Sequence, residues 1–156
     1  MTETNFALTP IDDETAAMLR ERGGPTYVAD EFPGYPCRQC LCDAEIGEQL
    51  VLVSHDPFGK SSEYRSASPI FLHTTPCRPP KQAEGELPIQ LTRRQLSVRS
   101  FDEDEMMLTA EVIDGIVLRD TLNRFFADEQ ARRIHVHNAS RGCWAVAVDR
   151  PRSNAA

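Results

Sequence analysis

The sequence predicts a single α+β domain, with a mainly antiparallel sheet and two helices packed on it. Three observations lead to this class. Segments with strand-like patterning follow one another in pairs separated by short turns, as in hairpins. Only two segments have helical patterning. The length of 156 residues suits one domain, which we place at residues 6–150, with residues 151–156 as a disordered tail.

The N-terminal half is expected to contain one helix and three strands. Residues 1–10 are expected to be extended. Acidic residues Asp12 to Glu14 favour a helix start, since they lie at the positive end of the helix dipole. The helix would present Ile11, Met18 and Leu19 as a thin apolar stripe and end at Gly23. Strands are expected at residues 27–29, 49–55 and 69–73.

The C-terminal half is expected to contain two hairpins on either side of a second helix. Residues 95–101 and 107–113 would pair through an acidic turn, and residues 133–138 and 143–149 through a turn at 139–142. With that second turn, His137 would face Trp144 across the hairpin. Apolar residues at helical spacing predict the helix between the hairpins, and Asp120 with Arg124 would be a supporting ion pair. The apolar positions are Leu118, Leu122, Phe125 and Phe126.

Composition and charge exclude several classes of partner. The formal net charge of −7 would repel a phosphate backbone, so we expect no nucleic-acid partner. No basic segment followed by an apolar stretch begins the chain, and no apolar run reaches membrane-spanning length. We therefore expect no membrane partner and a cytoplasmic location. Five cysteines in such a chain are expected to be free thiols or metal ligands and not disulfides.

The most specific spacing is Cys37-x2-Cys40 followed by His73-x3-Cys77. Two thiolates on a tight turn and a second pair from a distant turn can complete a tetrahedral site, and this mixture of ligands favours zinc. Neither half carries the glycine that often lets such a turn close around a metal. The alternative is that these cysteines are buried free thiols, because free cysteine is among the most buried residue types.

A second group of candidate residues lies in the last hairpin. His135 and His137 would project from one face of a strand, close in sequence to Cys143. Together with Cys37 and Arg38 they could form a catalytic pocket, in which a cysteine is the nucleophile and a histidine the base. The alternative is that the histidines lie on a half-exposed sheet face, packed against Trp144.

The remaining charged residues are more consistent with a solvent-exposed loop than with a catalytic site. Asp43, Glu45 and Glu48 could act as paired acid and base, but their turn-like segment makes solvent exposure the preferred interpretation. Arg38 could lower the pKa of a neighbouring thiol, or it could point outward.

Several segments, in order along the chain, are similar to one known family. They are Tyr27-Val28-Ala29-Asp30, Pro36-Cys37-Arg38, Asp43-Ala44-Glu45-x-Gly47-Glu48, Ser68-Pro69-Ile70-Phe71, Arg99-Ser100-Phe101-Asp102, Phe125-Phe126-Ala127-Asp128 and His135-Val136-His137-Asn138-Ala139-x-x-Gly142-Cys143. Over residues 6–150 the chain resembles the bacterial domain-of-unknown-function family 1203. The resemblance implies one domain over nearly the whole chain and a bacterial source, but no activity.

The resemblance also divides the candidate residues into two sets. One set matches the family pattern and comprises Cys37, Arg38, His135, His137, Asn138 and Cys143. The other looks like an addition to it and comprises Cys40, Cys42, His73 and Cys77.

Three functional hypotheses follow from the sequence. The first is a non-catalytic domain with a structural zinc ion. The second is a thiol- and histidine-dependent enzyme with a pocket around Cys37, His137 and Cys143. The third is a protein-interaction module that uses a sheet edge or the proline-rich residues 74–88, with homodimerisation through the sheet as a variant.

Overall fold

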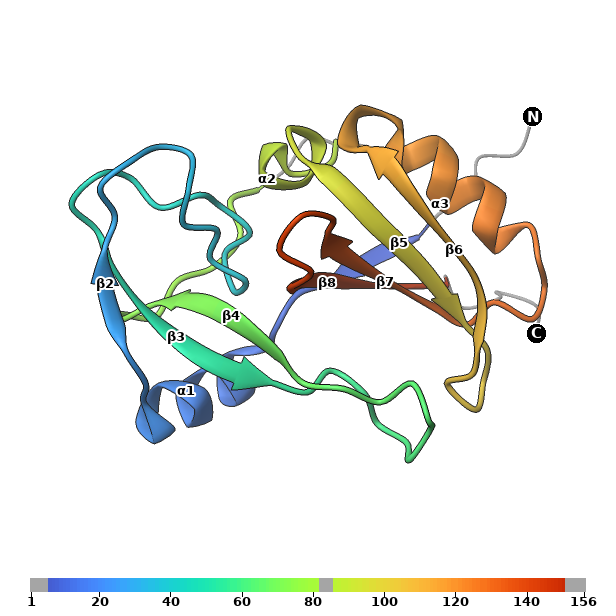
Figure 1. Cartoon of the computed structure of the whole chain (residues 1–156), viewed down its shortest axis with the longest axis horizontal. Helices are drawn as coiled ribbons and strands as arrows, with labels where there is room; N and C mark the ends of the chain where they lie inside the picture. The colour runs from blue at the N-terminus through green and yellow to red at the C-terminus, as the bar shows by residue number, and fades with distance from the viewer. Residues whose placement is uncertain (1–5, 82–85, 151–156) are drawn as a thin grey trace.

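The chain folds into two antiparallel sheets that lie side by side (Figure 1). The computed structural model describes residues 6–81 and 86–150, so the tail predicted at 151–156 lies outside the described residues. The five-stranded sheet has the order β1-β8-β7-β5-β6, and the three-stranded sheet has the order β2-β3-β4. The strands are β1 (Ala7–Thr9), β2 (Thr26–Val28), β3 (Gln49–His55), β4 (Ser68–His73), β5 (Gln95–Phe101), β6 (Met107–Asp114), β7 (Arg133–Asn138) and β8 (Trp144–Asp149).

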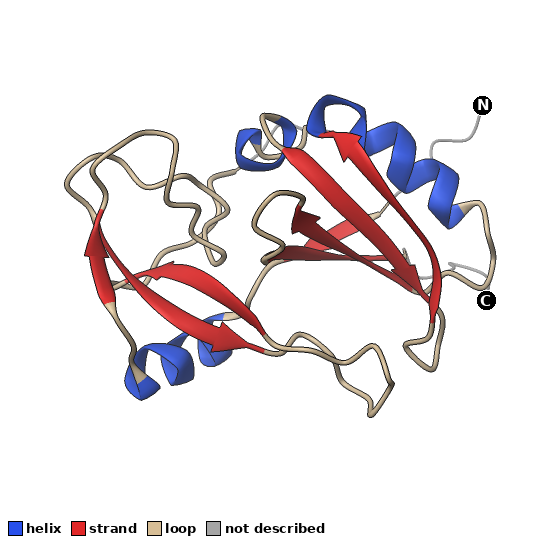
Figure 2. Ribbon diagram, viewed as in Figure 1, coloured by secondary structure: helices blue, strands red, loops and turns tan. Residues whose placement is uncertain are grey.

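Each sheet has its own main helix, as Figure 2 shows by colour. Helix α3 (Leu118–Phe126) packs its apolar stripe against β5, β7 and β8, whose facing residues include Val98, Ile134 and Val146. Helix α1 (Asp13–Arg22) packs Ala16 and Leu19 against the three-stranded sheet. The α+β class with antiparallel pairing is confirmed, although the strands form two sheets where the pattern predicted one.

The ends of α1 follow the sequence signals closely. The Asp12 carboxylate accepts the Thr15 N–H at 2.6 Å as an N-cap, and Gly23 ends the helix with a positive φ of 76°. Met18 departs from the prediction, since it is 52% exposed, and the buried apolar contacts come from Ile11, Ala16 and Leu19.

Three short elements were not predicted from the sequence. Strand β1 lies in the stretch predicted to be only extended, and it pairs with β8. Helix α2 (Ile89–Thr92) follows the proline-rich segment and is too short to have a periodic pattern. A single 3₁₀ turn, Gly115–Val117, precedes α3. No helix among the described residues has the length and apolar character needed to cross a bilayer.

The β7–β8 hairpin places His137 opposite Trp144 as predicted, but a bulge between Val136 and His137 then shifts the register, so Val136 pairs with Val146. The hairpin face that carries the two histidines is buried, whereas the alternative interpretation of the sequence had it half-exposed. It is buried because it packs toward the three-stranded sheet. His135 is 1% and His137 4% exposed, and the His135 ring packs against both Phe58 and Phe101, which also contact each other. The predicted Asp120–Arg124 pair is also wrong, since Arg124 pairs with Glu111 of β6 instead.

Candidate metal centre

Cys37 and Cys40 are held by a short loop, residues 36–43, which we call the cysteine loop. A β-bridge joins Pro36 to Asp43, and the Leu41 N–H donates to the Cys37 carbonyl at 3.1 Å. No glycine is needed to close this turn, because Leu41 itself has a positive φ of 59°. This turn brings the sulfurs of Cys37 and Cys40 within 4.8 Å of each other.

The end of strand β4 brings His73 to the cysteine loop. Cys37 forms a parallel bridge with Phe71, and the Arg38 N–H donates to the Phe71 carbonyl at 2.9 Å. The His73 N–H then donates to the Cys37 sulfur at 3.3 Å. Cys77 follows β4 after a few residues, so one strand end supplies two of the four predicted ligands.

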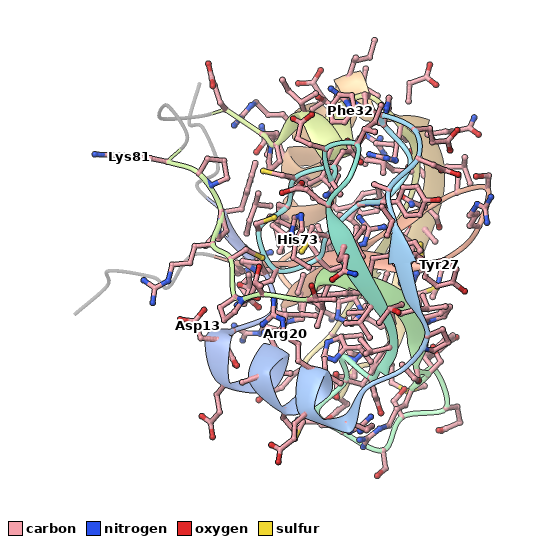
Figure 3. All side chains as sticks on the ribbon, turned by 90° about the vertical axis from the view of Figure 1, so that its left-hand side faces the viewer. Asp13, Arg20, Tyr27, Phe32, His73 and Lys81 are labelled. Atoms are coloured by element: carbon pink, nitrogen blue, oxygen red, sulfur yellow. The ribbon has the colours of Figure 1, made fainter. Side chains whose placement is uncertain are left out.

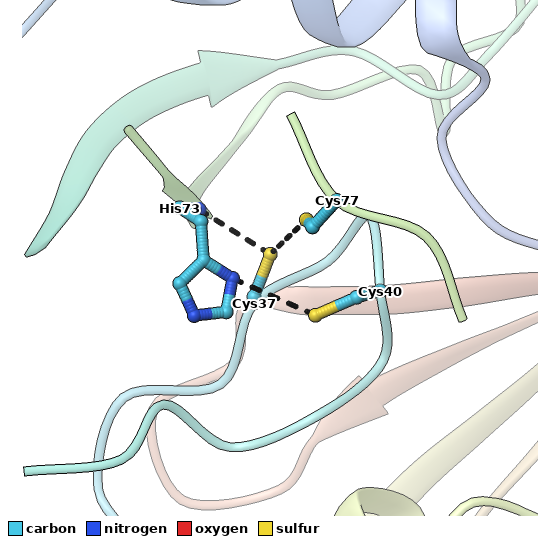
Figure 4. Close-up of side chains that lie close together, drawn as sticks. All are labelled: Cys37, Cys40, His73 and Cys77. Atoms are coloured by element: carbon cyan, nitrogen blue, oxygen red, sulfur yellow. Dashed lines mark hydrogen bonds between the residues drawn. The ribbon is translucent and has the colours of Figure 1, made fainter. Parts of the chain in front are cut away.

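The four residues predicted as metal ligands lie together (Figure 4). The sulfurs of Cys37, Cys40 and Cys77 and one ring nitrogen of His73 are all within 4.8 Å of one another. The Cys37 and Cys77 sulfurs are 3.6 Å apart, and the Cys40 sulfur is 3.6 Å from His73 Nδ1. A tetrahedral zinc site places neighbouring ligand atoms about 3.6–3.8 Å apart, given the usual Zn–S and Zn–N lengths. The observed distances therefore fit such a site.

Glu48 fixes the orientation of the His73 ring. The ring Nε2 lies 3.2 Å from the Glu48 carboxylate, which can only accept, so Nε2 carries a proton and Nδ1 faces the sulfurs, 3.6 Å from that of Cys40. Carboxylate–histidine pairs of this kind commonly support metal-bound histidines. Two hydrogen bonds lower the pKa of Glu48, chiefly that from the Glu45 N–H and then that from His73.

The electrostatics of the cluster favour a cation between the ligands. Hydrogen bonds from Cys40 and then Cys77 lower the pKa of Cys37, whereas the hydrogen bond to Cys37 raises the pKa of Cys40. The neighbouring Cys37 and Cys77 sulfurs raise the pKa of His73 to about 11. Without an ion, the protonated His73 ring is thus the positive charge beside the Cys37 sulfur, and a bound metal ion would replace the proton at Nδ1.

Helix α1 contributes a further positive charge next to the cluster, from Arg20. Its guanidinium donates to the His73 carbonyl at 2.7 Å, approaches the Cys77 sulfur at 3.9 Å and bonds Gln39. Figure 3 shows Arg20 and His73 on the same side of the molecule. A cleft bordered by Asp13 and Arg20 touches the cluster at Cys77.

The structure separates the other candidate residues from this cluster. Arg38 points away from Cys37 and is fully buried, and its guanidinium donates to Gln90 at 2.8 Å and to the Cys143 sulfur at 3.4 Å. His137 Nδ1 is 2.9 Å from the Gly142 carbonyl. Among the described residues, no hydrogen bond joins Cys37 or Cys143 to His135 or His137.

Of the three acidic residues predicted to be solvated, Asp43 is the exception. It is buried, and Arg93 and Arg94 bind its carboxylate. Glu45 and Glu48 are exposed as predicted, although Glu48 also contacts His73. The sequence singled out Glu48 as an acid but carried no signal for its partner. Nothing in the sequence marked Arg20, Gln39 or Gln90, because their contacts join distant segments.

A comparison with family models places residues 34–150 in the family described as protein of unknown function, DUF1203. The chain belongs to this family. The match covers the cysteine loop, β4 and the β7–β8 hairpin, so both groups of candidate residues lie inside it. Searches of curated proteins and of solved structures found no match to this chain.

Proposed function

We propose that this protein is a zinc-binding domain, in which Cys37, Cys40, His73 and Cys77 hold one structural zinc ion. The observation that carries the proposal is the convergence of three sulfurs and one imidazole nitrogen within 4.8 Å, from a tight loop and a distant strand end. Three thiolates and an imidazole are ligands that suit zinc, and the hard cations calcium and magnesium prefer oxygen.

The closed ligand set supports a structural role over a catalytic one. Catalytic zinc sites keep an open position for water or substrate, whereas structural sites have four protein ligands. Cys37 and Cys40 are buried, and the His73 side chain is 12% exposed, so little room remains for a reactant at the ion. The ion would join the cysteine loop, β4 and residues 74–77. Ligands of this kind also favour a reducing compartment such as the cytoplasm.

Metal analysis tests this proposal directly. The protein is purified without added zinc and its metals are quantified by plasma mass spectrometry. We expect close to one equivalent of zinc per chain, because structural zinc binds tightly through three thiolates. Replacement of zinc by cobalt(II) should give the visible spectrum of a tetrahedral cobalt–thiolate site. Less than about one tenth of an equivalent, even after zinc is added to reduced protein, would exclude the proposal.

Cys42 offers a matched control within the same loop. Its sulfur lies 3.6 Å from the Cys40 carbonyl and outside the ligand cluster. Cys77→Ser should therefore lose the zinc and the cobalt spectrum, and Cys42→Ser should keep both. Equal metal content in the two variants would contradict the assigned ligand set.

A further inference from the structure

A second cleft, separate from the metal centre, has Cys143 at its polar end. Its volume is about 850 Å³, and aromatic residues Tyr27, Tyr35 and Phe71 border one part of it. Arg38, Asn138, Arg141 and Cys143 border the other part. Cys143 is partly exposed there, so a small molecule in the cleft could reach its sulfur.

The Arg38 guanidinium behind this sulfur is a buried positive charge without a carboxylate partner. Its side chain has no exposed surface, its Nε has no hydrogen-bond partner, and no carboxylate of the described residues lies within 4 Å of it. Asp43, the acid that most affects it, is already bound by Arg93 and Arg94. A buried charge without a carboxylate partner is costly, so an anionic group that enters the cleft beside Arg38 would reduce this cost.

Asn138 adds a second donor on the same sulfur. The residue is buried, with 9% of its surface exposed, and its Nδ2 lies 3.5 Å from Cys143 Sγ. The Asn138 Oδ1 is buried without a hydrogen-bond partner. A guanidinium and an amide that both donate to one sulfur hold the negative charge that this sulfur carries when it attacks an electrophile.

We propose that Cys143 is a thiol-modification site that undergoes exchange with small anionic disulfides bound in this cleft. The Cys143 sulfur attacks one sulfur of the disulfide, whose S–S bond breaks as the new S–S bond forms. The thiol proton passes to water, and the other half of the disulfide leaves as a thiolate. The two electrons stay within the exchange, so no further oxidant is required.

The charges around the cleft favour an anionic reagent in spite of the acidic chain. Arg141 lies at its edge, and no ion pair among the described residues involves it. Arg93 and Arg94 also border the cleft, and Asp43 neutralises one of their two charges. Glu31 is the opposing acid, so Arg38 and Arg141 leave the cleft with a positive balance.

The rate at which each cysteine reacts can be measured in the folded protein whose metal content is known. The protein is treated with the anionic aromatic disulfide dithiobis(nitrobenzoate) or with the neutral dithiodipyridine. After digestion, mass spectrometry identifies which cysteine has reacted. We expect Cys143 to react with the anionic reagent roughly tenfold faster than Cys42, and added salt to reduce this advantage. Equal rates for the two cysteines with both reagents would overturn the proposal.

Variants distinguish the site from simple exposure of a thiol. Cys143→Ser should abolish the fast reaction, and Asn138→Ala should slow it without loss of the fold. Arg141→Ser should slow only the anionic reagent. A fast reaction that survives in Cys143→Ser, or that is unchanged in both other variants, would refute the mechanism. This outcome is independent of the zinc proposal, whose failure would instead appear as rapid reaction of Cys37, Cys40 and Cys77.

Discussion

At the scale of single residues, His135 has surroundings that accept only the neutral ring. Its ring centroid lies 4.8 Å from Phe58 and 5.1 Å from Phe101, and neither ring nitrogen has a hydrogen-bond partner. Burial, and then the nearby His137, lower the pKa of His135 to about 3. This environment is that of a core residue, so we assign His135 no role as a catalytic base.

His135 should make the fold sensitive to acid. At pH 7 the ring is neutral in both the folded and unfolded chain, so it has no effect on stability through protonation. Below pH 6.5, the ordinary value, the unfolded chain takes up a proton that the folded chain refuses until about pH 3. Stability is therefore lost as the pH falls, by about 2 kcal/mol between pH 7 and pH 5 from this residue alone.

His135→Phe tests this account, because the variant removes the titrating group and fits an aromatic environment. The free energy of unfolding in urea, measured at pH 7 and at pH 5, should fall by about 2 kcal/mol less in the variant than in the wild type. At pH 7 the variant should be at least as stable, since two unpaired buried nitrogens are gone. An identical acid dependence in both proteins would disprove the assignment.

At the scale of elements, helix α2 anchors the cysteine loop through a buried ion pair. Arg94, just after the helix, binds Asp43 with two nitrogens, at 2.5 and 3.2 Å, and Arg93 binds it once at 3.0 Å. The Asp43 side chain is only 2% exposed. From within the helix, Gln90 donates to the Cys37 carbonyl at 3.1 Å and accepts from Arg38. A short helix thus supports both candidate sites.

The two arginines should contribute unequally to stability. Arg94→Met removes a bidentate partner and leaves a buried carboxylate poorly compensated, which should cost about 3 kcal/mol. Arg93→Met, at a side chain that is 30% exposed, should cost about 1 kcal/mol. Urea unfolding of the two variants measures the difference. Equal losses of unfolding free energy in the two variants would show that the bidentate contact of Arg94 has no special role.

The same elements show what the sequence could reveal. Strand β3 and helix α3 were predictable because a local period of apolar residues defines each of them. The cluster of candidate metal ligands could be recognised because each pair lies on one short segment with a known spacing. The division into two sheets was not, since it depends on which distant strands pair. Arg38 and Cys143 were both recognised, but their contact was hidden by their separation in sequence.

At the scale of the whole molecule, the buried apolar residues form two clusters that share strand β8. One cluster joins α1 to the three-stranded sheet and includes Cys37, Cys40 and, from β8, Trp144 and Ala147, while the other joins α3 to β5, β7 and the opposite face of β8. The residues around the candidate zinc, including Arg20 and Glu48, all belong to the half with the three-stranded sheet (Figure 1). The ion should therefore stabilise one half of the molecule more than the other.

Removal of zinc should accordingly increase local opening in the cluster around α1 and the three-stranded sheet more than in the cluster around α3. With a chelator, amide hydrogen exchange should rise most in the cysteine loop and in β4, because the ion no longer ties these segments together. Amides of β5 and β7, which pair with each other and pack against α3, should keep most of their protection. Cys77→Ser should show the same pattern without the chelator and should not respond to it. If protection fell equally in β4 and β7, the ion would stabilise the fold as one cooperative unit, and the separate response of the two clusters would be disproved.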